Sequence, residues 1–225
     1  MQLEVVVTDA SEAVEAQRAG ASRVELVADF ERGGLTPDTQ LVESVVGALS
    51  IPVHVMLRPH DNGFSYSEKD RHAIVRDASR MRELGASALV FGALDKRAHV
   101  SVEFVREVLD AGRLPLTFHR AFDATPSLSG AYATLAGIAG VERVLTAGGA
   151  PTAWEGRTWL RELCYGNTLP TVLGAGSIDA GNLQDLVHFT RLREVHVGQG
   201  ARTDGKIDPR KIERMVALLN GGPPG

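Results

Sequence analysis

Two short sequence patterns alternate along the chain and predict its strands. In the first pattern, a glycine that ends a helical stretch precedes an apolar run by three or four residues. Its copies are GASRVEL (Gly20–Leu26), GASALVF (Gly85–Phe91) and GVERVLT (Gly140–Thr146). In the second pattern, a proline stands at the entrance of the apolar run, where its missing N–H is tolerated. Its copies are IPVHVML (Ile51–Leu57), LPLTFHR (Leu114–Arg120) and LPTVLGA (Leu169–Ala175). With Leu3–Val7 and Glu194–Gly198 added at the ends, these runs predict eight strands.

The segments between these runs carry apolar residues at helical spacing. After Thr36 and Pro37, a cap followed by proline at the first helical position, one apolar stripe comprises Leu41, Val42, Val45, Val46 and Leu49. Further helix starts are predicted at Ser67, which forms a capping-box pattern with Asp70, at Ser101, and at Asp208 before Pro209. Helices are also expected near residues 134 and 157.

The spacing of the repeats predicts the fold. Copies of one pattern recur every 55 to 65 residues, which is about the length of two βα units of a barrel. Eight alternations of strand and helix predict an α/β protein with a parallel, closed sheet. We therefore expect a single (β/α)8 TIM-type barrel over residues 1–220, with residues 221–225 as a loose tail. The alternative, an open doubly wound sheet, lacks the early glycine fingerprint in this chain.

Composition excludes several classes of function. The 225 residues are 44% hydrophobic and 23% charged, as in an ordinary globular protein, and the net charge is -4 with both signs intermixed. This charge gives no case for a nucleic-acid or membrane partner. No apolar run approaches the roughly 18 residues that span a bilayer, and the first residues lack the pattern of a signal peptide. The single cysteine, Cys164, fits a reducing compartment, so we expect a cytoplasmic protein.

The stretch TFHRAFD (Thr117–Asp123) has the pattern of a buried strand that ends in a polar pocket. Because side chains alternate along a strand, Thr117 and His119 should share one face, and Phe118 should share the other with Arg120. In a barrel, function collects where strands end and the next loops begin. His119, Arg120 and Asp123 are therefore candidates, and the other polar residues embedded in predicted strands are Glu4, Glu25, His54, Arg58, Thr146 and His196.

Structural roles compete with functional ones at these positions. Glu4 and Glu25 could equally form ion pairs with Arg58 or Arg120 inside the barrel. His54 comes early in its strand and is interpreted as a core histidine, whereas the contexts of His119 and His196 favour a site. Glycine clusters follow three strands, and their residues include Gly148, Gly174, Gly176, Ser177, Gly198 and Gly200. They indicate either phosphate binding by backbone N–H groups or the ordinary preference of tight turns for glycine.

Several longer segments are similar to those of the CutC family, named for copper homeostasis. They are GASRVELVADFERGGLTPD (Gly20–Asp38), IPVHVMLRP (Ile51–Pro59), TFHRAFD, RVLTAGG (Arg143–Gly149), GAGS and EVH (Glu194–His196). The resemblance runs from about Leu3 to His196. It implies a TIM-type barrel, a cytoplasmic location, homo-oligomers and a copper-binding role.

This chain departs from the family at the cysteines that relatives carry after the glutamates of the first two strands. Val6, Val7 and Val27 stand at those positions, and Met56 is the one sulfur expected near the strands of the mouth. Because Cu(I) prefers thiolate or thioether ligands, a copper site of that design cannot form. The remaining Glu, His, Arg and Asp residues suit a harder divalent metal or an anionic organic ligand.

Two hypotheses of different class follow. The first is a metal-homeostasis protein that holds copper or another divalent ion with Glu25, His119 and His196. The second is an enzyme, with or without a metal, that acts on a small anionic metabolite which could carry a phosphate. In that enzyme, Glu25 or Asp123 would transfer a proton together with His119. The ligand-binding residues would be Arg58, Arg120, Thr146, Gly174, Gly176, Ser177, Gly198 and Gly200.

Overall fold

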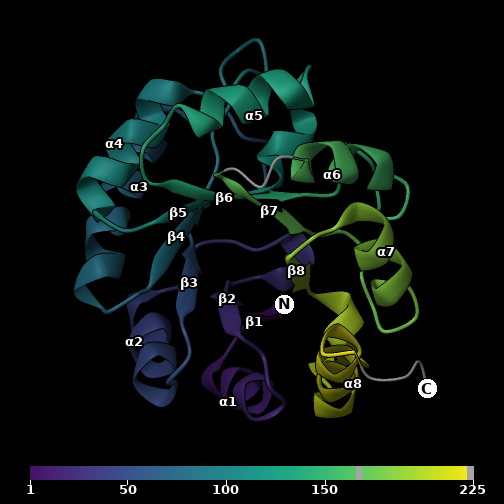
Figure 1. Ribbon diagram of the computed structural model, residues 1–225. Helices are drawn as coiled ribbons and strands as arrows, with labels where there is room; N and C mark the ends of the chain where they lie inside the picture. Colours follow the sequence, from purple (N-terminus) through teal and green to yellow (C-terminus); the bar gives the residue numbers. More distant parts are fainter. Residues whose placement is uncertain (166–168, 222–225) are drawn as a thin grey trace.

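The computed structural model describes residues 1–165 and 169–221, which form a closed barrel of parallel strands with helices around it (Figure 1). Each strand pairs with the next, and the last pairs with the first. The barrel strands are β1 (Gln2–Val7), β2 (Arg23–Leu26), β3 (Val53–Met56), β4 (Ala88–Phe91), β5 (Leu116–Phe118), β6 (Val141–Thr146), β7 (Thr171–Gly174) and β8 (Glu194–Val197). The prediction of a single (β/α)8 barrel is confirmed. Of the predicted tail, residues 222–225 lie outside the described ranges.

A helix follows each strand and covers the outside of the barrel (Figure 1). The helices are α1 (Ala10–Arg18), α2 (Thr39–Ala48), α3 (Glu68–Glu83), α4 (Val102–Gly112), α5 (Leu128–Ala136), α6 (Arg157–Cys164), α7 (Leu183–Thr190) and α8 (Pro209–Leu219). Short 3-10 turns η1 (Phe30–Arg32), η2 (Arg120–Ala124) and η3 (Gln199–Ala201) and a small hairpin of β9 (Arg202–Thr203) and β10 (Lys206–Ile207) complete the described chain. Within that part of the chain, no helix is long and apolar enough to cross a membrane.

Helix starts follow the capping residues of the sequence, with one correction. The capping box of Ser67 and Asp70 is present at the start of α3. The predicted cap at Thr36 is wrong, because α2 begins three residues later and Asp38 accepts a hydrogen bond from the Leu41 N–H at 2.8 Å. Thr36 instead accepts a hydrogen bond from the backbone N–H of Arg58 at 2.7 Å, and so ties the loop before α2 to the end of β3.

The strands divide their side chains between two environments. In β5, Phe118 packs outward into the main apolar core under the helices. Inward-facing positions form two smaller apolar clusters inside the barrel, which are Val6, Val27, Met56 and Val90, and Leu145, Leu173 and Ala175. Because Glu4 and Glu25 alternate with outward-facing valines and leucines, they share the barrel interior with these clusters.

The fifth strand is shorter than predicted. It ends at Phe118, whereas the sequence pattern carried it to Arg120. His119 is the N-cap of η2, where its carbonyl oxygen accepts a hydrogen bond from the Phe122 N–H and its ring accepts one from the Ala121 N–H. The strand stops because His119 satisfies the first donors of this turn.

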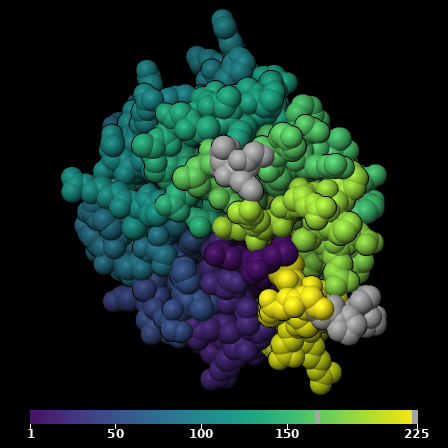
Figure 2. All heavy atoms as spheres, viewed as in Figure 1, coloured from purple at the N-terminus to yellow at the C-terminus, as the bar shows by residue number. Residues whose placement is uncertain are grey.

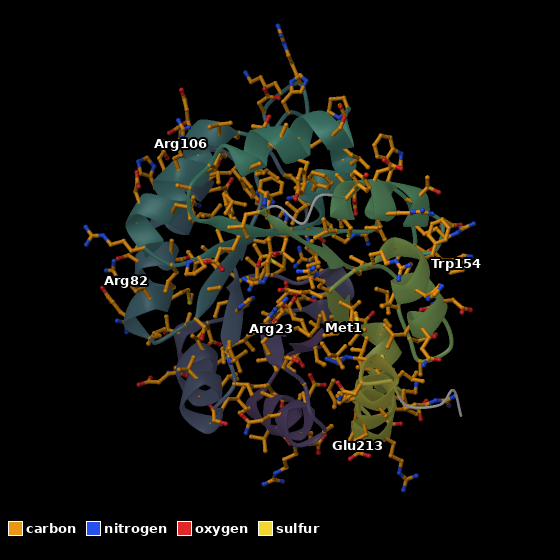
Figure 3. All side chains as sticks on the ribbon, in the orientation of Figure 1. Met1, Arg23, Arg82, Arg106, Trp154 and Glu213 are labelled. Carbon is orange, nitrogen blue, oxygen red and sulfur yellow. The ribbon has the colours of Figure 1, made fainter. Side chains whose placement is uncertain are left out.

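Buried ion pairs fill the amino-terminal part of the barrel interior. Arg23, at the start of β2, contacts Glu4 at 2.5 Å and Glu194 at 2.6 Å, and Arg143 also reaches Glu194 at 2.9 Å. The alternative that Glu4 pairs with Arg58 or Arg120 is therefore wrong. Figure 3 shows Arg23 and Met1 close together near the barrel centre in this view. In Figure 2 the N-terminal residues (purple) cover the middle of the same face beside α8 (yellow).

Removing the shared guanidinium should destabilise the barrel strongly. Arg23→Ala leaves Glu4 buried without its guanidinium partner and leaves Glu194 with Arg143 alone, and breaking a buried ion pair typically costs about 3–5 kcal/mol. We expect a loss of this size in the free energy of unfolding measured by urea denaturation. Arg32→Ala is the control, because Arg32 pairs with Asp61 on the exposed surface and its loss should change the midpoint little. Equal effects of the two substitutions would contradict this assignment.

Candidate functional site

A cavity of about 150 Å³ opens inside the barrel beyond the carboxyl ends of β1, β2, β3, β5, β6 and β8. Its polar lining consists of Glu25, Arg58, His119, Arg120 and His196. Its apolar walls are Val6, Val27, Phe30, Met56, Phe64 and Leu145. The barrel therefore gathers five of the predicted site residues around one small space with largely apolar walls.

Glu25 is a buried carboxyl group with one free oxygen. Its Oε1 atom has no hydrogen-bond partner, and its Oε2 atom lies 3.9 Å from Nε2 of His196. Burial raises the pKa of Glu25 to about 7, with a further contribution from Glu4, while the His196 charge works in the opposite direction. Glu25 therefore exchanges a proton near neutral pH, as a general acid or base requires.

His196 connects Glu25 to the ion pairs deeper in the barrel. Its Nδ1 atom lies 2.7 Å from Oε1 of Glu4. Burial alone would lower the pKa of His196, but Glu25 and the hydrogen bond to Glu4 outweigh it and raise that pKa. Burial likewise works to raise the pKa of Glu4, yet Arg23, His196 and His54 together hold it well below its usual range. Glu4 is thus a carboxylate that receives the Nδ1 proton of His196, and Nε2 of His196 faces Glu25.

His119 presents an N–H group to the same cavity. Its Nδ1 atom accepts a hydrogen bond from the Ala121 N–H at 3.1 Å, so the proton of the neutral ring is on Nε2. Nε2 is buried and has no partner. Burial, and after it the Arg58 charge, lower the pKa of His119 to about 3, so the ring is neutral at physiological pH. His119 is therefore a hydrogen-bond donor at this position.

The two arginines of the cavity differ in how fully they are engaged. Arg58 donates through Nη1 to the carbonyl oxygens of Arg32 and Gly33 at 3.4 and 3.2 Å, while its buried Nε has no partner. Arg120 donates through Nε to Asp123 at 2.8 Å and through Nη2 to the carbonyl oxygen of Ala150 at 3.2 Å. Arg58 therefore has the free donor capacity for an anion.

Asp123 and Thr146 hold the loop between β6 and α6. The carboxylate of Asp123 accepts hydrogen bonds from Arg120, from the Thr146 hydroxyl and from the backbone N–H groups of Ala147 and Gly149. Thr146 also accepts one from the Gly148 N–H at 2.8 Å. Neither residue lines the cavity, so of the two candidate bases the structure brings Glu25, and not Asp123, to the cavity.

The glycines after β7 and β8 have close packing neighbours. A Cβ atom on Gly174 would lie 2.5 Å from Leu192, one on Gly198 would lie 2.8 Å from the Phe30 ring, and one on Gly200 would lie 2.0 Å from the carbonyl oxygen of Ile178. Ser177 and Gly200 line a separate surface hollow with Lys211 and Arg214, while Gly176 has a φ of +105°. Packing explains these glycines without a ligand, and a phosphate role for them stays a prediction.

The sequence analysis missed two residues that shape the site. Gly92 lies against His119, because a Cβ there would be 2.5 Å from the ring Nδ1. The sequence feature that could have identified Gly92 is its position directly after the fourth strand. Arg23 stands two residues before Glu25, so strand alternation puts both in the barrel interior. The buried hydroxyl of Thr117 also has no hydrogen-bond partner.

The geometry changes the predicted metal-ligand set. Among the described residues, Glu4, Glu25 and His196 offer ligand atoms within 4.8 Å of one another, and His119 is not part of this group. The donor atoms are carboxylate oxygen and imidazole nitrogen, which suit a divalent ion better than Cu(I).

The pH dependence of stability should report the pKa of Glu25. An unfolded glutamate titrates near 4.5 and the folded Glu25 near 7, so between these values the folded state binds more proton. Its contribution to the free energy of unfolding therefore falls as pH rises through this window, by about 3 kcal/mol in total. Glu25→Gln should remove this fall, so the variant gains on the wild type toward pH 7. Urea denaturation of both proteins from pH 4.5 to 8 measures this pH dependence of the free energy of unfolding.

The control for the lost charge is Glu43→Gln on the exposed face of α2. A difference between Glu25→Gln and wild type that stays constant across this pH range would show that Glu25 does not have a raised pKa.

Gly92→Ala should displace the His119 ring. The added methyl group overlaps Nδ1, so the hydrogen bond from the Ala121 N–H must break or lengthen, at a cost of about 1–3 kcal/mol. We expect a lower unfolding midpoint together with altered NMR signals of the His119 ring. Gly47→Ala in α2 is the control, because nothing lies within 4 Å of its Cβ position. Unchanged His119 signals would contradict the close packing.

Comparison with known proteins agrees with this architecture. Residues 1–201 match the model of the CutC family. A CutC family protein of Klebsiella pneumoniae is 37% identical over 199 residues, covering 88% of this chain and 80% of the relative. One from Salmonella typhimurium is 38% identical over 189 residues, covering 84% and 75%.

Solved structures give the same result. A CutC protein of Streptococcus agalactiae, named for copper homeostasis, superposes with a TM-score of 0.82 at 28% identity, covering 88% of this chain and 98% of that one. A phosphoribosylanthranilate isomerase of Thermotoga maritima shares the fold alone, with a TM-score of 0.67 at 14% identity over 98% and 99% of the two chains. The chain belongs to the CutC family.

Proposed function

We propose that this protein is an enzyme that binds a small anionic metabolite in the barrel cavity and transfers a proton with Glu25. One observation carries the proposal. Three buried polar atoms without partners, Oε1 of Glu25, Nε2 of His119 and Nε of Arg58, belong to residues that line one cavity. An unpaired buried polar group typically costs about 1–3 kcal/mol, and a bound ligand that supplies the missing partners removes this cost.

The chemical character of these atoms supports the type of ligand and reaction. Arg58 offers a charged donor, which makes short, strong hydrogen bonds to carboxylate or phosphate. Glu25 has a pKa near the working pH, which suits proton transfer. The apolar walls keep water away from both groups and strengthen their interactions with a bound molecule.

A second candidate function is the binding of copper or another divalent metal. The CutC protein of S. agalactiae is named for copper homeostasis, and the ligand atoms of Glu4, Glu25 and His196 lie close together. Glu4 is already engaged with Arg23 and with Nδ1 of His196, so Glu25 and Nε2 of His196 would be the direct ligands. A carboxylate behind a metal-binding histidine is a common arrangement.

The available donors argue against Cu(I). The sulfur atom among the described cavity residues is that of Met56, and Cys164, a free thiol, lies on α6 away from this cavity. Oxygen and nitrogen donors favour Cu(II) or Zn(II) over Cu(I). Copper binding at this site is therefore proposed for the divalent ion.

We also propose a cytoplasmic location and self-association. A free thiol at Cys164 is consistent with a reducing compartment. Trp154 and Phe189 are partly exposed, and the Arg157 guanidinium lies 4.6 and 5.7 Å from the centres of their rings. Trp159, which lies on α6 with Arg157, is 47% exposed. Such an exposed aromatic surface over α6 and α7 favours contact with a second copy of the chain.

A thermal-shift screen tests the enzyme proposal against metal binding. The probes are inorganic phosphate, pyruvate, lactate and 2-phosphoglycolate as anions, and Cu(II) and Zn(II) as metals. A ligand at 100 times its Kd stabilises the folded state by about 2.7 kcal/mol. We expect at least one organic anion to raise the Tm of the wild type, and Arg58→Met to abolish that rise.

Arg32→Met is the matched control, because Arg32 lies in the neighbouring loop but does not line the cavity. It should keep the response to the anion. Stabilisation by a metal that is lost in Glu25→Gln, with no response to any anion, would favour the second candidate and contradict the first.

A further inference from the structure

We infer that the proton transfer is an enolisation, in which Glu25 removes a proton from the carbon next to a carbonyl group whose oxygen accepts a hydrogen bond from Nε2 of His119. The substrate is then a small carbonyl compound that carries a carboxylate or phosphate for Arg58. This inference rests on the proposed function and names its reaction and its substrate class.

The hydrogen bond at Nδ1 decides what His119 can do. The backbone N–H of Ala121 donates to Nδ1 at 3.1 Å, and Gly92 packs against the same side of the ring. The proton of the neutral ring must therefore be on Nε2, the buried atom without a partner. In this form Nε2 cannot take up a proton, and it can only donate a hydrogen bond. The low pKa of His119 agrees with a ring that remains neutral.

Glu25 supplies the complementary group. Its Oε1 atom is buried and accepts no hydrogen bond, and Nε2 of His196 at 3.9 Å from Oε2 is too distant to donate one. Besides the Arg58 donor, the cavity thus contains a donor fixed by its tautomer, Nε2 of His119, and a free acceptor, Oε1 of Glu25. A carbonyl oxygen matches the donor and an adjacent C–H group matches the acceptor. A carboxylate base combined with a neutral imidazole donor is a known pattern among enolising enzymes.

Other common reaction types lack their groups in this cavity. Among the described residues that line it, there is no serine, threonine, cysteine or lysine. These residues therefore include neither the hydroxyl and thiol nucleophiles usual in acyl transfer nor a lysine for a Schiff base. Acid–base chemistry on a C–H bond needs only the groups that are present.

The step balances without a co-reactant. The C–H bond breaks, its electron pair forms a C=C bond, and the carbonyl π electrons move to the oxygen. His119 stabilises the negative charge on that oxygen through Nε2–H, and Glu25 holds the proton. When the proton on Glu25 is replaced by one from solvent before the same carbon is reprotonated, the net result is hydrogen exchange with solvent. In a 2-hydroxy carbonyl compound, return to the former carbonyl carbon, with the hydroxyl proton passing to the other oxygen, interconverts an aldose and a ketose.

The size and lining of the cavity limit the substrate. At roughly 30 Å³ for each water molecule, 150 Å³ holds about five water-sized groups, which is enough for the reacting part of a substrate whose anionic end lies at the rim. The walls contributed by Val27, Met56 and Leu145 are suited to a short carbon chain. Arg58, on the rim side of β3, is suited to an anionic end group.

Two measurements test the inference. The first follows deuterium entry by NMR in D2O, next to the carbonyl of 2-oxobutanoate, hydroxypyruvate and dihydroxyacetone phosphate. The second compares the Kd of 2-phosphoglycolohydroxamate, a planar mimic of an enediolate, with that of 2-phosphoglycolate. We expect enzyme-dependent exchange in at least one compound, abolished in Glu25→Gln, and at least 100-fold tighter binding of the hydroxamate.

His119→Asn isolates the donor, because the Asn side-chain oxygen can still accept from the Ala121 N–H while the Nε2–H group is lost. It should bind both ligands alike and keep the unfolding midpoint of the wild type within a few degrees. His72→Asn on the exposed face of α3 is the control and should retain the preference. A preference that survives in His119→Asn would overturn the role given to His119.

The outcomes separate the two proposals. If 2-phosphoglycolate binds with dependence on Arg58, but the hydroxamate is not preferred and no compound exchanges, the enolisation is overturned and the anion site stands. If neither ligand binds, the proposed function itself fails, and this inference fails with it.

Discussion

The rest of the barrel interior depends on the interactions of the Glu4 carboxylate with Arg23 and His196. This carboxylate lies in β1 at the centre of a closed sheet, fully buried, where a lone charge would be very unfavourable. Arg23 neutralises one oxygen and His196 donates to the other, while His54 lies 3.2 Å away. Because Glu4 remains charged, the proton of His196 is fixed on Nδ1. That leaves Nε2 of His196 directed at Glu25. The buried charge of Glu4 therefore influences the proton positions on His196 and Glu25.

The barrel interior therefore has two parts that differ in how their buried polar groups are paired. Toward the amino ends of the strands, Arg23, Glu194 and Arg143 satisfy one another and close the barrel. Toward the carboxyl ends, Glu25 and His119 retain unpaired atoms beside an apolar cavity. The unpaired atoms at this end are the ones that the proposed ligand would complete. This agrees with the general location of function in barrels of this type.

Membership of the CutC family accounts for the fold of this chain. What the cavity can bind depends on the side chains that line it. Val6 and Val27 offer no metal-ligand atom and form part of the apolar wall of the cavity. Burial among such apolar walls raises the pKa of Glu25.

The sequence by itself determined the parts of this protein that depend on local pattern. Alternating apolar positions in β1 to β8, the capping box of Ser67 and the proline of α8 are properties of neighbouring residues, so the barrel and most helix starts could be predicted. The same alternation predicted the opposite faces of Thr117 and Phe118, but it was wrong for Arg120, which lines the cavity with His119 because the strand ends at Phe118. Only the tertiary structure decided which residues meet across the barrel.

Glu4 pairs with Arg23 and not with Arg58 because the register of the closed sheet puts Glu4 beside Arg23. Asp123 is occupied by backbone N–H groups of a loop 24 to 26 residues further along the chain, and no local pattern reveals that. The tautomer of His119 likewise depends on a turn that ends its strand early. Strand register, burial and loop hydrogen bonds are properties of the whole chain, which is why sequence pattern found the candidates but could not assign their roles.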